Sequence, residues 1–353
     1  MATSGTVSTT VFNTRKVIDH AFRRCKLSPQ QITPEYIETA QDLLFLFLST
    51  LASKGIALWA IDKVILPLYA YQQTVPCPVG TVDVLNANLR TSTRVTNETL
   101  FTSSEGFAEY AFDGDIDTEC VQTLPAGWIQ SQLDSVTAAP LFGILPGSSG
   151  LWDVSIQASQ DGITWTTLYT NDALIALDGE WHWIDIQGVI PYLYYRLQAN
   201  NLTVLNVREF YVGNLPNEIE IAKVNRDDYA NLPNKFFTGR PVQFWYNKQR
   251  DQPLMEIWPA PMEQYTFAQL VLYTQRYVQD VGSMTQELEV PQRWYKPIML
   301  QLGKDLAGEI AEVQPGVANE IAMELMPVLR EAWDSETDSA PSYILPNISC
   351  YTR

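Results

Sequence analysis

Alternating polar and apolar positions past the middle of the chain predict a β-hairpin. Val242, Phe244 and Tyr246 share one face of the first stretch, and Met255 and Ile257 share one face of the second. Alternation with a period of two in aromatic and β-branched residues is typical of half-buried strands. The polar segment between the two stretches fits a connecting loop. We interpret the hairpin as part of a scaffold, because it holds no group suited to catalysis.

Apolar residues spaced three and four apart predict helices at both ends of the chain. The predicted helices cover residues 12–26, the segment from Pro34 to near Gly55, residues 291–310, and the segment that follows Pro315. The segment after Pro34 is apolar on most faces, so it needs other helices packed against it. We therefore expect the two ends of the chain to pack together. Pro327 is expected to kink or restart the last helix.

Shorter alternating patterns predict strands between the helices. In the flanking segments the predicted strands cover residues 64–71, 81–89 and 267–277, and residues 69–90 are expected to form a hairpin. In the middle of the chain they cover residues 152–158, 181–186, 193–199 and 204–212. Ile163 and Trp165 follow a Gln-Asp-Gly turn and are expected to continue the apolar face of residues 152–158. Many short strands separated by turns predict an all-β sandwich or jelly roll in this part of the chain.

Charge is distributed unevenly along the chain, whose formal net charge is −17. Residues 92–213 contain 15 Asp and Glu against 3 Arg, or −12, which leaves 25 acidic and 20 basic residues, or −5, for the remainder. This contrast marks residues 92–213 as a separate unit. Strong acidity argues against a protein that grips the nucleic-acid backbone, although an acidic wall lets a polyanion slide past.

Four basic residues cluster in the first predicted helix: Arg15, Lys16, Arg23 and Arg24. The cluster is interpreted either as a solvated helix face or as a contact for an acidic partner or nucleic acid.

Residues needed for common catalytic sites are scarce. The chain has two histidines, His20 and His182, and lacks the glycine-rich loop that binds nucleotide phosphates. We therefore predict no catalytic residues and no enzymatic activity. The four cysteines lie far apart, which favours buried, reduced thiols over a disulfide framework. No secretory signal peptide and no bilayer-spanning segment are expected.

An acidic loop at residues 113–119 is the one cluster suited to a cation. Three alternating aspartates resemble the start of a calcium-binding loop. Thr118 stands at the sixth position and Leu124 at the twelfth, so an EF-hand is excluded. The loop is either an acidic turn or a single oxygen-lined calcium site.

Residues 92–213 resemble a discoidin, or galactose-binding-like, domain of the coagulation-factor type C and carbohydrate-binding-module kind. The resemblance lies in SSEGFAEYAFDGDIDTECVQ, in the SQDG turn followed by a Trp, and in the YYRL and VREF strands. It implies a structural calcium site at Asp113, Asp115, Thr118 and Glu209. Cys120 replaces the Trp that such domains usually have.

Exposed aromatic side chains commonly form glycan sites. Trp128, Trp181 and Trp183 are therefore candidate ligand-binding residues, with packing in a core as the alternative role of each.

The flanking segments resemble the head-to-tail adaptor of short-tailed bacteriophages, of the tail tubular protein A kind. The resemblance lies in the helix pair at the start, in YAYQQTVPCPVGTVDVLNANLR, in RDDYANLPNKFFTGRPVQFWYNK, in LMEIWPAP, and in VPQRWYKPIMLQLGKDLA. It implies a dodecameric ring between the portal protein and the tail nozzle or tubular protein, with tail fibres as a further partner. DNA passes through such a ring without sequence-specific binding, and no membrane partner is expected.

These patterns together predict an α+β protein, with a helical adaptor core and a small antiparallel β-sheet. Residues 1–91 and 214–353 form this discontinuous core, which ends in an arm at residues 334–353. Residues 92–213 form an inserted, all-β, discoidin-like jelly-roll sandwich. The predicted function is a structural virion protein, assembled in the bacterial host cytoplasm, whose ring joins portal to tail nozzle and lets the genome pass. The alternative is a carbohydrate-binding virion or surface protein whose sandwich binds host glycans.

Overall fold

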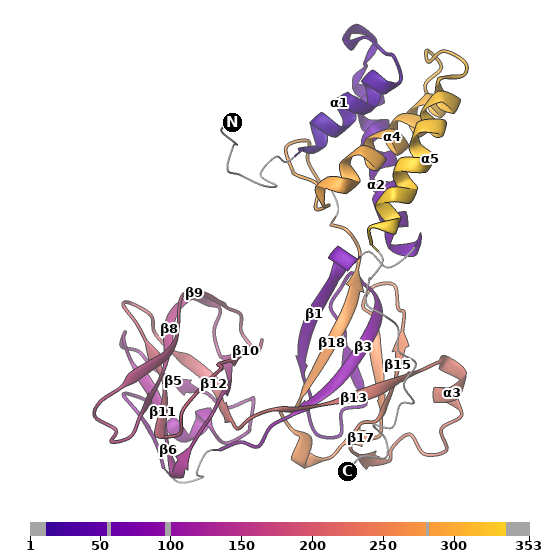
Figure 1. The fold of residues 1–353 in the computed structure, drawn as a ribbon. Coiled ribbons are helices and arrows are strands. Elements are labelled where there is room, and N and C mark those ends of the chain that lie inside the picture. The colour runs from indigo at the N-terminus through magenta and orange to yellow at the C-terminus, as the bar shows by residue number, and fades with distance from the viewer. Residues whose placement is uncertain (1–11, 55–57, 96–99, 280–281, 337–353) are drawn as a thin grey trace.

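The computed structural model describes residues 12–54, 58–95, 100–279 and 282–336. A helical bundle lies at one end of a long β-sheet, and a β-sandwich lies beside the other end of that sheet (Figure 1). Short helical segments occur in the connections: η1 (Pro29–Gln31), η2 (Leu58–Ala60), η3 (Ala108–Ala111), α3 (Arg226–Ala230) and η4 (Glu263–Tyr265).

The bundle is built from helices at the two ends of the described chain. It comprises α1 (Thr14–Arg24), α2 (Pro34–Lys54), α4 (Gln292–Glu309) and α5 (Val317–Asp334), and α4 packs against each of the other three. Their buried apolar residues form one cluster that includes the fully covered ring of Trp294. The prediction that the two ends of the chain pack together is therefore confirmed.

The start of α1 and the course of α5 past a proline are both defined by local contacts. Asn13 begins α1 by accepting a hydrogen bond from the Lys16 backbone N–H at 3.0 Å. Pro327 was expected to kink or restart the last helix, and α5 continues through this residue without a restart. Leu325 and Ala332 are buried on either side of it, so packing against the bundle offsets the missing hydrogen bond. Gly55 lies outside the described residues.

The central sheet has seven strands and is larger than the small antiparallel sheet predicted. Its order is β1 (Ile61–Pro67), β18 (Gln269–Arg276), β3 (Thr81–Thr91), β13 (Asn217–Val224), β15 (Gln243–Asn247), β16 (Leu254–Trp258) and β2 (Thr74–Pro76). β13 and β15 are parallel, and the other neighbours are antiparallel. A separate pair is formed by β14 (Thr238–Gly239) and β17 (Ala260–Pro261).

The predicted hairpin near residue 250 is confirmed as β15 and β16. Phe244, Tyr246, Met255 and Ile257 are buried on one face, as the alternation indicated. The predicted hairpin at residues 69–90 is wrong, because β18 lies between β1 and β3 and β2 pairs with β16. Most residues of β18 are buried, as a central position in the sheet allows.

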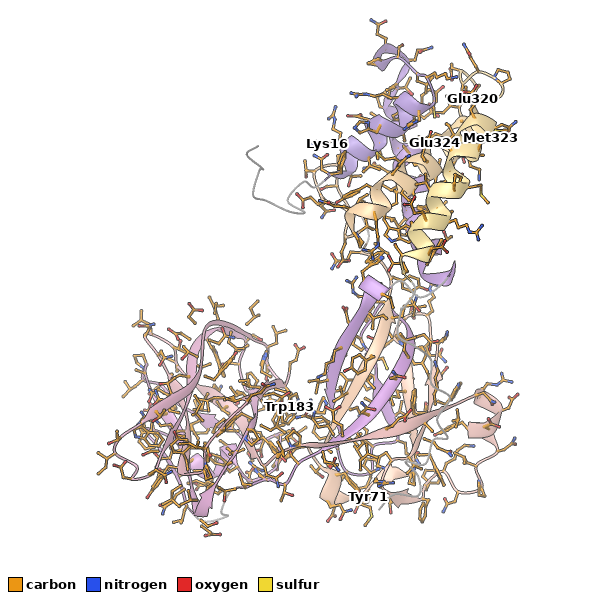
Figure 2. All side chains as sticks on the ribbon, in the orientation of Figure 1. Lys16, Tyr71, Trp183, Glu320, Met323 and Glu324 are labelled. Atoms are coloured by element: carbon orange, nitrogen blue, oxygen red, sulfur yellow. The ribbon has the colours of Figure 1, made fainter. Side chains whose placement is uncertain are left out.

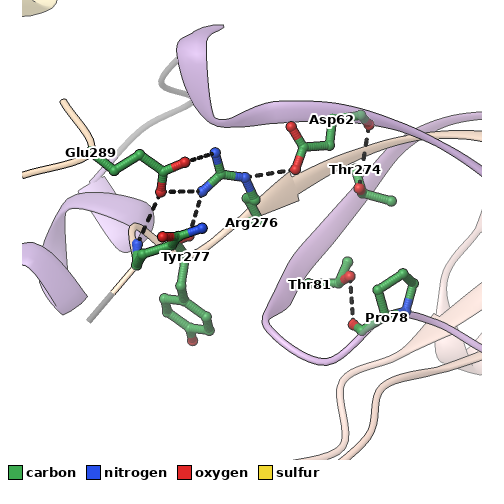
Figure 3. A network of polar contacts seen from close by, with 8 residues as sticks. Asp62, Pro78, Thr81, Thr274, Arg276, Tyr277 and Glu289 are labelled. Atoms are coloured by element: carbon green, nitrogen blue, oxygen red, sulfur yellow. Dashed lines mark hydrogen bonds and ion pairs between the residues drawn. The ribbon is translucent and has the colours of Figure 1, made fainter. Parts of the chain in front are cut away.

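Arg276 fixes the junction between sheet and bundle. It lies at the end of β18 and donates to Asp62 on β1 at 2.6 Å and to Glu289, which precedes α4, at 2.6 and 2.8 Å (Figure 3). One guanidinium thus joins the sheet to the segment that leads into the bundle.

The sandwich contains two facing sheets. One has the order β10 (His182–Asp185), β7 (Leu141–Pro146), β12 (Asn206–Gly213) and β5 (Cys120–Val121), and the other β4 (Phe101–Ser103), β6 (Trp128–Thr137), β11 (Tyr192–Ala199), β8 (Gly150–Ser159) and β9 (Thr166–Ala176). The rings of Phe142, Tyr195 and Phe210 are fully buried between them, in a cluster drawn only from this part of the chain. The predicted all-β sandwich is confirmed.

The chain enters and leaves the sandwich at one place. Thr91 at the end of β3 pairs with Asn217 at the start of β13. Farther out, Arg94 forms a β-bridge with Gly213, and the Asn214 N–H donates to the Thr93 carbonyl at 3.0 Å. The sandwich therefore extends from what is otherwise a hairpin position between two adjacent strands.

Three other sequence features have defined outcomes. Cys25, Cys77 and Cys120 are buried free thiols, and burial raises the pKa of each to about 11. Within the described residues, every helix is too short or too polar to cross a bilayer. Of the expected arm at residues 334–353, residues 337–353 lie outside the described part, as does Cys350.

Candidate functional site

The four-stranded sheet of the sandwich turns an aromatic face toward the seven-stranded sheet. Trp181 is only 9% exposed and stacks on Trp183, with ring centroids 4.6 Å apart. Its ring also meets Phe267 at 5.2 Å, and its Nε1 donates to the Tyr69 hydroxyl at 3.1 Å. Figure 2 shows Trp183 on the side of the sandwich that faces this sheet. We call this contact region, made by Trp181, Trp183, Tyr211, Phe267 and Tyr69, the mount.

Two backbone features make room for the mount. A Cβ at Gly143 on β7 would lie 2.4 Å from the Trp183 ring, so only glycine lets both indoles lie flat on the strand. Phe267 has φ of +65°, a region that bulky residues rarely adopt. That conformation places its ring among Trp181, Tyr211 and Tyr69.

Arg90 adds an ionic contact beside the aromatic mount. This β3 residue is 7% exposed and pairs with Glu218 on β13 at 2.6 Å and with Asp185 on β10 at 2.8 Å. A buried guanidinium with two carboxylates is a strong, directional contact. The mount therefore fixes the orientation of the sandwich on the sheet.

A groove with a volume of about 610 Å³ runs along the junction. Arg94 and Tyr211 line it from the sandwich, and Gln264, Tyr265 and Phe267 line it from the other side. Arg94 already pairs with Glu209, and the Tyr211 hydroxyl hydrogen-bonds to Ser92 Oγ at 2.7 Å. These two polar groups of the groove are thus engaged within the protein.

The five-stranded sheet has its outer side turned away from the mount (Figure 1). We define the open face as the outward residues of β6, β11 and β8 together with the Trp that precedes β9: Trp128, Gln130, Gln132, Gln157, Trp165, Tyr194, Arg196 and Gln198. Each is partly exposed. They alternate with buried core residues such as Ile129, Ile156 and Leu197, as a half-buried sheet requires.

Arg196 lies at the centre of the open face. Its register partners are Gln130 on β6 and Gln157 on β8. Its Nε and Nη2 donate to Gln157 Oε1 at 2.8 and 2.6 Å, and its Cζ lies 3.9 Å from the Trp165 ring centroid. Tyr194 meets Trp165 edge-on at 6.5 Å. A cation, two aromatic rings and several amides therefore share one flat surface.

The acidic loop brings several oxygen atoms together. Thr118 Oγ1 lies 2.8 Å from Asp113 Oδ2, 3.0 Å from the Asp115 carbonyl oxygen and 3.4 Å from the Tyr110 carbonyl oxygen. Hard oxygen donors of this kind suit calcium. Among the described residues, no three His, Cys, Asp or Glu side chains converge as a metal site. The oxygen set is therefore one of hydroxyl, carbonyl and a single carboxylate.

Glu209 reaches the same loop from β12. Its side chain is fully buried, pairs with Arg94 at 2.7 Å, and accepts a hydrogen bond from the Gly114 N–H. Burial raises the pKa of this carboxyl to about 7, against the opposing effect of Arg94. Glu209 thus holds the loop through its backbone.

The structure separates the three candidate tryptophans. Trp128 lies on the open face, whereas Trp181 and Trp183 lie in the mount on the opposite side of the sandwich. The expectation that Ile163 and Trp165 continue the apolar inner face is wrong, because Ile163 is 83% exposed and Trp165 packs on Arg196. The turn before β9 reverses the direction in which these side chains point.

Sequence analysis did not identify Arg196 and Trp165 as site residues. The available signal was Arg196 in an alternating strand, at a position that faces solvent, within a segment that has only 3 Arg. Burial lowers the pKa of the Arg196 guanidinium. Burial lowers the pKa of His182, against the opposing effect of Glu180.

Comparisons with solved structures find carbohydrate-binding modules. Chitosan-binding module 1 of a chitosanase/glucanase from Paenibacillus sp. IK-5 is 22% identical over 34% of this chain and 98% of its own, with a TM-score of 0.30. A CBM32 module of a family 31 glycoside hydrolase from Clostridium perfringens is 18% identical over 34% of this chain and 98% of its own, with a TM-score of 0.30. An F5/8 type C domain from Bacteroides fragilis is 15% identical over 35% of this chain and 96% of its own, with a TM-score of 0.29.

These are the kinds of domain that residues 92–213 resemble in sequence. No protein-family model matches the chain. No curated protein matches it either.

Proposed function

We propose that the sandwich binds carbohydrate through its open face, and that the rest of the chain carries the sandwich in a fixed orientation. The observation that supports this function is the set of aromatic, amide and guanidinium groups on one flat surface opposite the mount. Aromatic rings pack against the C–H faces of sugars, and amides hydrogen-bond to hydroxyl groups.

The spacing of the open face suits an oligosaccharide. Neighbouring strands lie about 4.8 Å apart, so Gln130, Arg196 and Gln157 span roughly 10 Å across β6, β11 and β8. Trp128 and Gln198 form the adjacent row, and Tyr194 lies in the row beyond Arg196. A chain of two or three sugars laid across the strands meets a polar or aromatic side chain at each step.

A glycan array probed with the full-length protein, followed by calorimetric titration of any hit, tests this function. Tyr194→Ala is expected to weaken binding about fivefold or more, since a ring contact contributes roughly 1 kcal/mol beyond its buried area. The matched control is Tyr277→Ala, which removes a half-exposed tyrosine outside the sandwich. Absence of any bound saccharide, or equal effects of the two variants, contradicts the proposal.

A ring-forming adaptor of a phage tail is the second candidate function. The observation that favours it is exposed apolar surface on the bundle: Phe45 and Leu46 on α2, and Met323 and Met326 on α5. Met323 projects from the outer side of α5 (Figure 2). Exposed apolar side chains on two different helices suit a heterologous contact, which closes into a ring when the rotation permits.

In this candidate function the ring joins the portal protein to the tail nozzle in the virion neck and lets DNA pass. Mass measurement and electron microscopy of the full-length protein, alone and with portal protein, test it. Met323→Glu with Met326→Glu is expected to prevent assembly, because each introduces a charge into the contact. A protein that remains monomeric in the presence of portal protein contradicts this function.

We propose calcium as a structural ligand of the acidic loop. Asp113, Thr118 and the carbonyl oxygen of Asp115 supply hard donors that converge, and Glu209 supports the loop from β12. The ion is assigned no part in sugar binding.

A further inference from the structure

We propose that the open face selects a glycan with an anionic sugar, whose carboxylate or sulfate pairs with Arg196. This inference rests on the proposed carbohydrate-binding function and adds the chemical class of the ligand. It depends on one contrast within the sandwich, between Arg196 and the other two arginines of residues 92–213.

The other two arginines are neutralised within the protein. Arg94 pairs with Glu209 at 2.7 Å, and Arg208 pairs with Asp178 at 2.8 Å. In the described part of the chain, Arg196 has no carboxylate within ion-pair distance. Its positive charge is therefore available to a ligand, although the surrounding unit carries a net charge of −12.

The guanidinium is held in position, yet part of its hydrogen-bonding capacity remains. Arg196 Nε and Nη2 both donate to the single oxygen Gln157 Oε1, and Trp165 covers one side of the guanidinium plane at 3.9 Å. A guanidinium has five N–H donors in a fixed fork. Those at Nη1 make no hydrogen bond within the described residues and can meet an oxyanion without rearrangement of the protein.

The cross-strand neighbours of Arg196 are neutral, and the acidic residues on this side of the sheet, Asp134 on β6 and Asp153 on β8, lie farther along their strands. Its register partners are Gln130 and Gln157, and Gln157 is followed across the sheet by Thr167 on β9. Asp153, nearer the start of β8, accepts hydrogen bonds from the side chains of Asn200 and Asn201. An isolated cation within a row of neutral polar groups is complementary to one negative charge on an otherwise neutral ligand.

The charge of the sandwich also limits the kind of anionic ligand. A net charge of −12 repels a long polyanion, while screening at physiological salt restricts that repulsion to about 8 Å. An oligosaccharide in which one sugar is acidic and the others are neutral places its charge at Arg196 and keeps its remaining length uncharged. The predicted ligand is therefore a mixed oligosaccharide and not a uniformly charged polymer.

The test compares oligosaccharides that share one backbone and carry no charge, one carboxylate or one sulfate. Titration of the full-length protein is expected to show binding of a charged form about tenfold or more tighter than the neutral form, as charge-assisted hydrogen bonds imply. The two charged forms distinguish a carboxylate from a sulfate ligand.

Three variants assign the preference to Arg196. Arg196→Gln is expected to remove the preference for the charged sugar, so that the charged and neutral forms bind this variant with equal affinity. Gln157→Glu gives Arg196 a carboxylate partner within the protein and is expected to have the same effect without loss of the cation. Arg208→Gln is the matched control, since it removes the same charge from the same unit and is expected to keep the preference.

The possible outcomes separate the two proposals. Equal affinity for charged and neutral forms, or a preference that survives Arg196→Gln, overturns the role of Arg196 and leaves carbohydrate binding in place. Absence of binding to every oligosaccharide overturns both proposals. Circular dichroism and thermal melting of each variant exclude loss of fold as the cause of lost binding.

Discussion

Truncation of Trp181 tests whether the mount couples the sandwich to the seven-stranded sheet. Trp181→Ala removes the stacking on Trp183, the ring contact with Phe267 and the hydrogen bond to the Tyr69 hydroxyl. Two ring pairs at about 1 kcal/mol each and one hydrogen bond at about 1 kcal/mol sum to about 3 kcal/mol. The apolar area that the variant no longer buries raises this free-energy loss toward roughly 3–5 kcal/mol, the range typical of Trp→Ala in a core.

This loss is expected to weaken the contact between the two units and to leave each unit folded. Each has its own buried cluster, so neither depends on the mount for its core. Differential scanning calorimetry of the full-length variant is therefore expected to show a separate transition for the sandwich, lowered by roughly 6 °C or more. Hydrogen exchange is expected to rise along β10 and at the Phe267 turn.

The matched control for this experiment is Trp165→Ala. It removes the same side chain from the same sandwich, but on the opposite side from the mount. Our reasoning is refuted if the two variants give the same thermogram, or if Trp181→Ala leaves exchange at the Phe267 turn unchanged. Either result means that the aromatic contacts do not couple the two units.

Three further predictions follow from the geometry. Replacement of residues 92–216 by Asn-Gly is expected to leave the seven-stranded sheet folded, because Thr91 and Asn217 are paired; absence of a cooperative thermal unfolding transition in this variant contradicts this. Addition of chelator is expected to lower the melting temperature of the wild type but not of Asp113→Ala; an equal shift in both contradicts a calcium site. The pKa of Asp161 is lowered to about 2, mainly by hydrogen bonds from the backbone N–H groups of Thr164 and Ile163. Its stabilisation is therefore present above about pH 4 and lost as pH falls toward 2. Asp161→Asn is expected to melt earlier than wild type at pH 6 and with a smaller difference near pH 2, and an unchanged difference contradicts the assignment.

Local patterns predicted local structure well. The β15–β16 hairpin and α1 follow from the spacing of their apolar residues, and both were found within a few residues of the expected bounds. Pairing between strands that are far apart in the sequence was harder to predict. The place of β18 between β1 and β3 depends on which apolar edges are left uncovered in three dimensions, and alternation within one strand contains no information on that choice.

The candidate site was predictable only in part. Alternation shows that Trp181, Trp183 and Asp185 share one side of a strand, but the sequence does not show what covers that side. The structure shows that Tyr69, Phe267 and Arg90 cover it, from strands and turns far away in the chain. Trp165 was misplaced because a turn separates it from the strand whose alternation was extended to it.

The single point of attachment of the sandwich has a mechanical consequence. Because Thr91 and Asn217 are paired neighbours, a force that pulls the sandwich away from the sheet acts on the ends of β3 and β13 together. Both strands are then drawn in the same direction, so the load shears them lengthwise past their outer neighbours, β18 and β15. Arg90 and Trp181 provide a second path by which tension reaches the body of the sheet, so the ends of β3 and β13 do not carry the whole load.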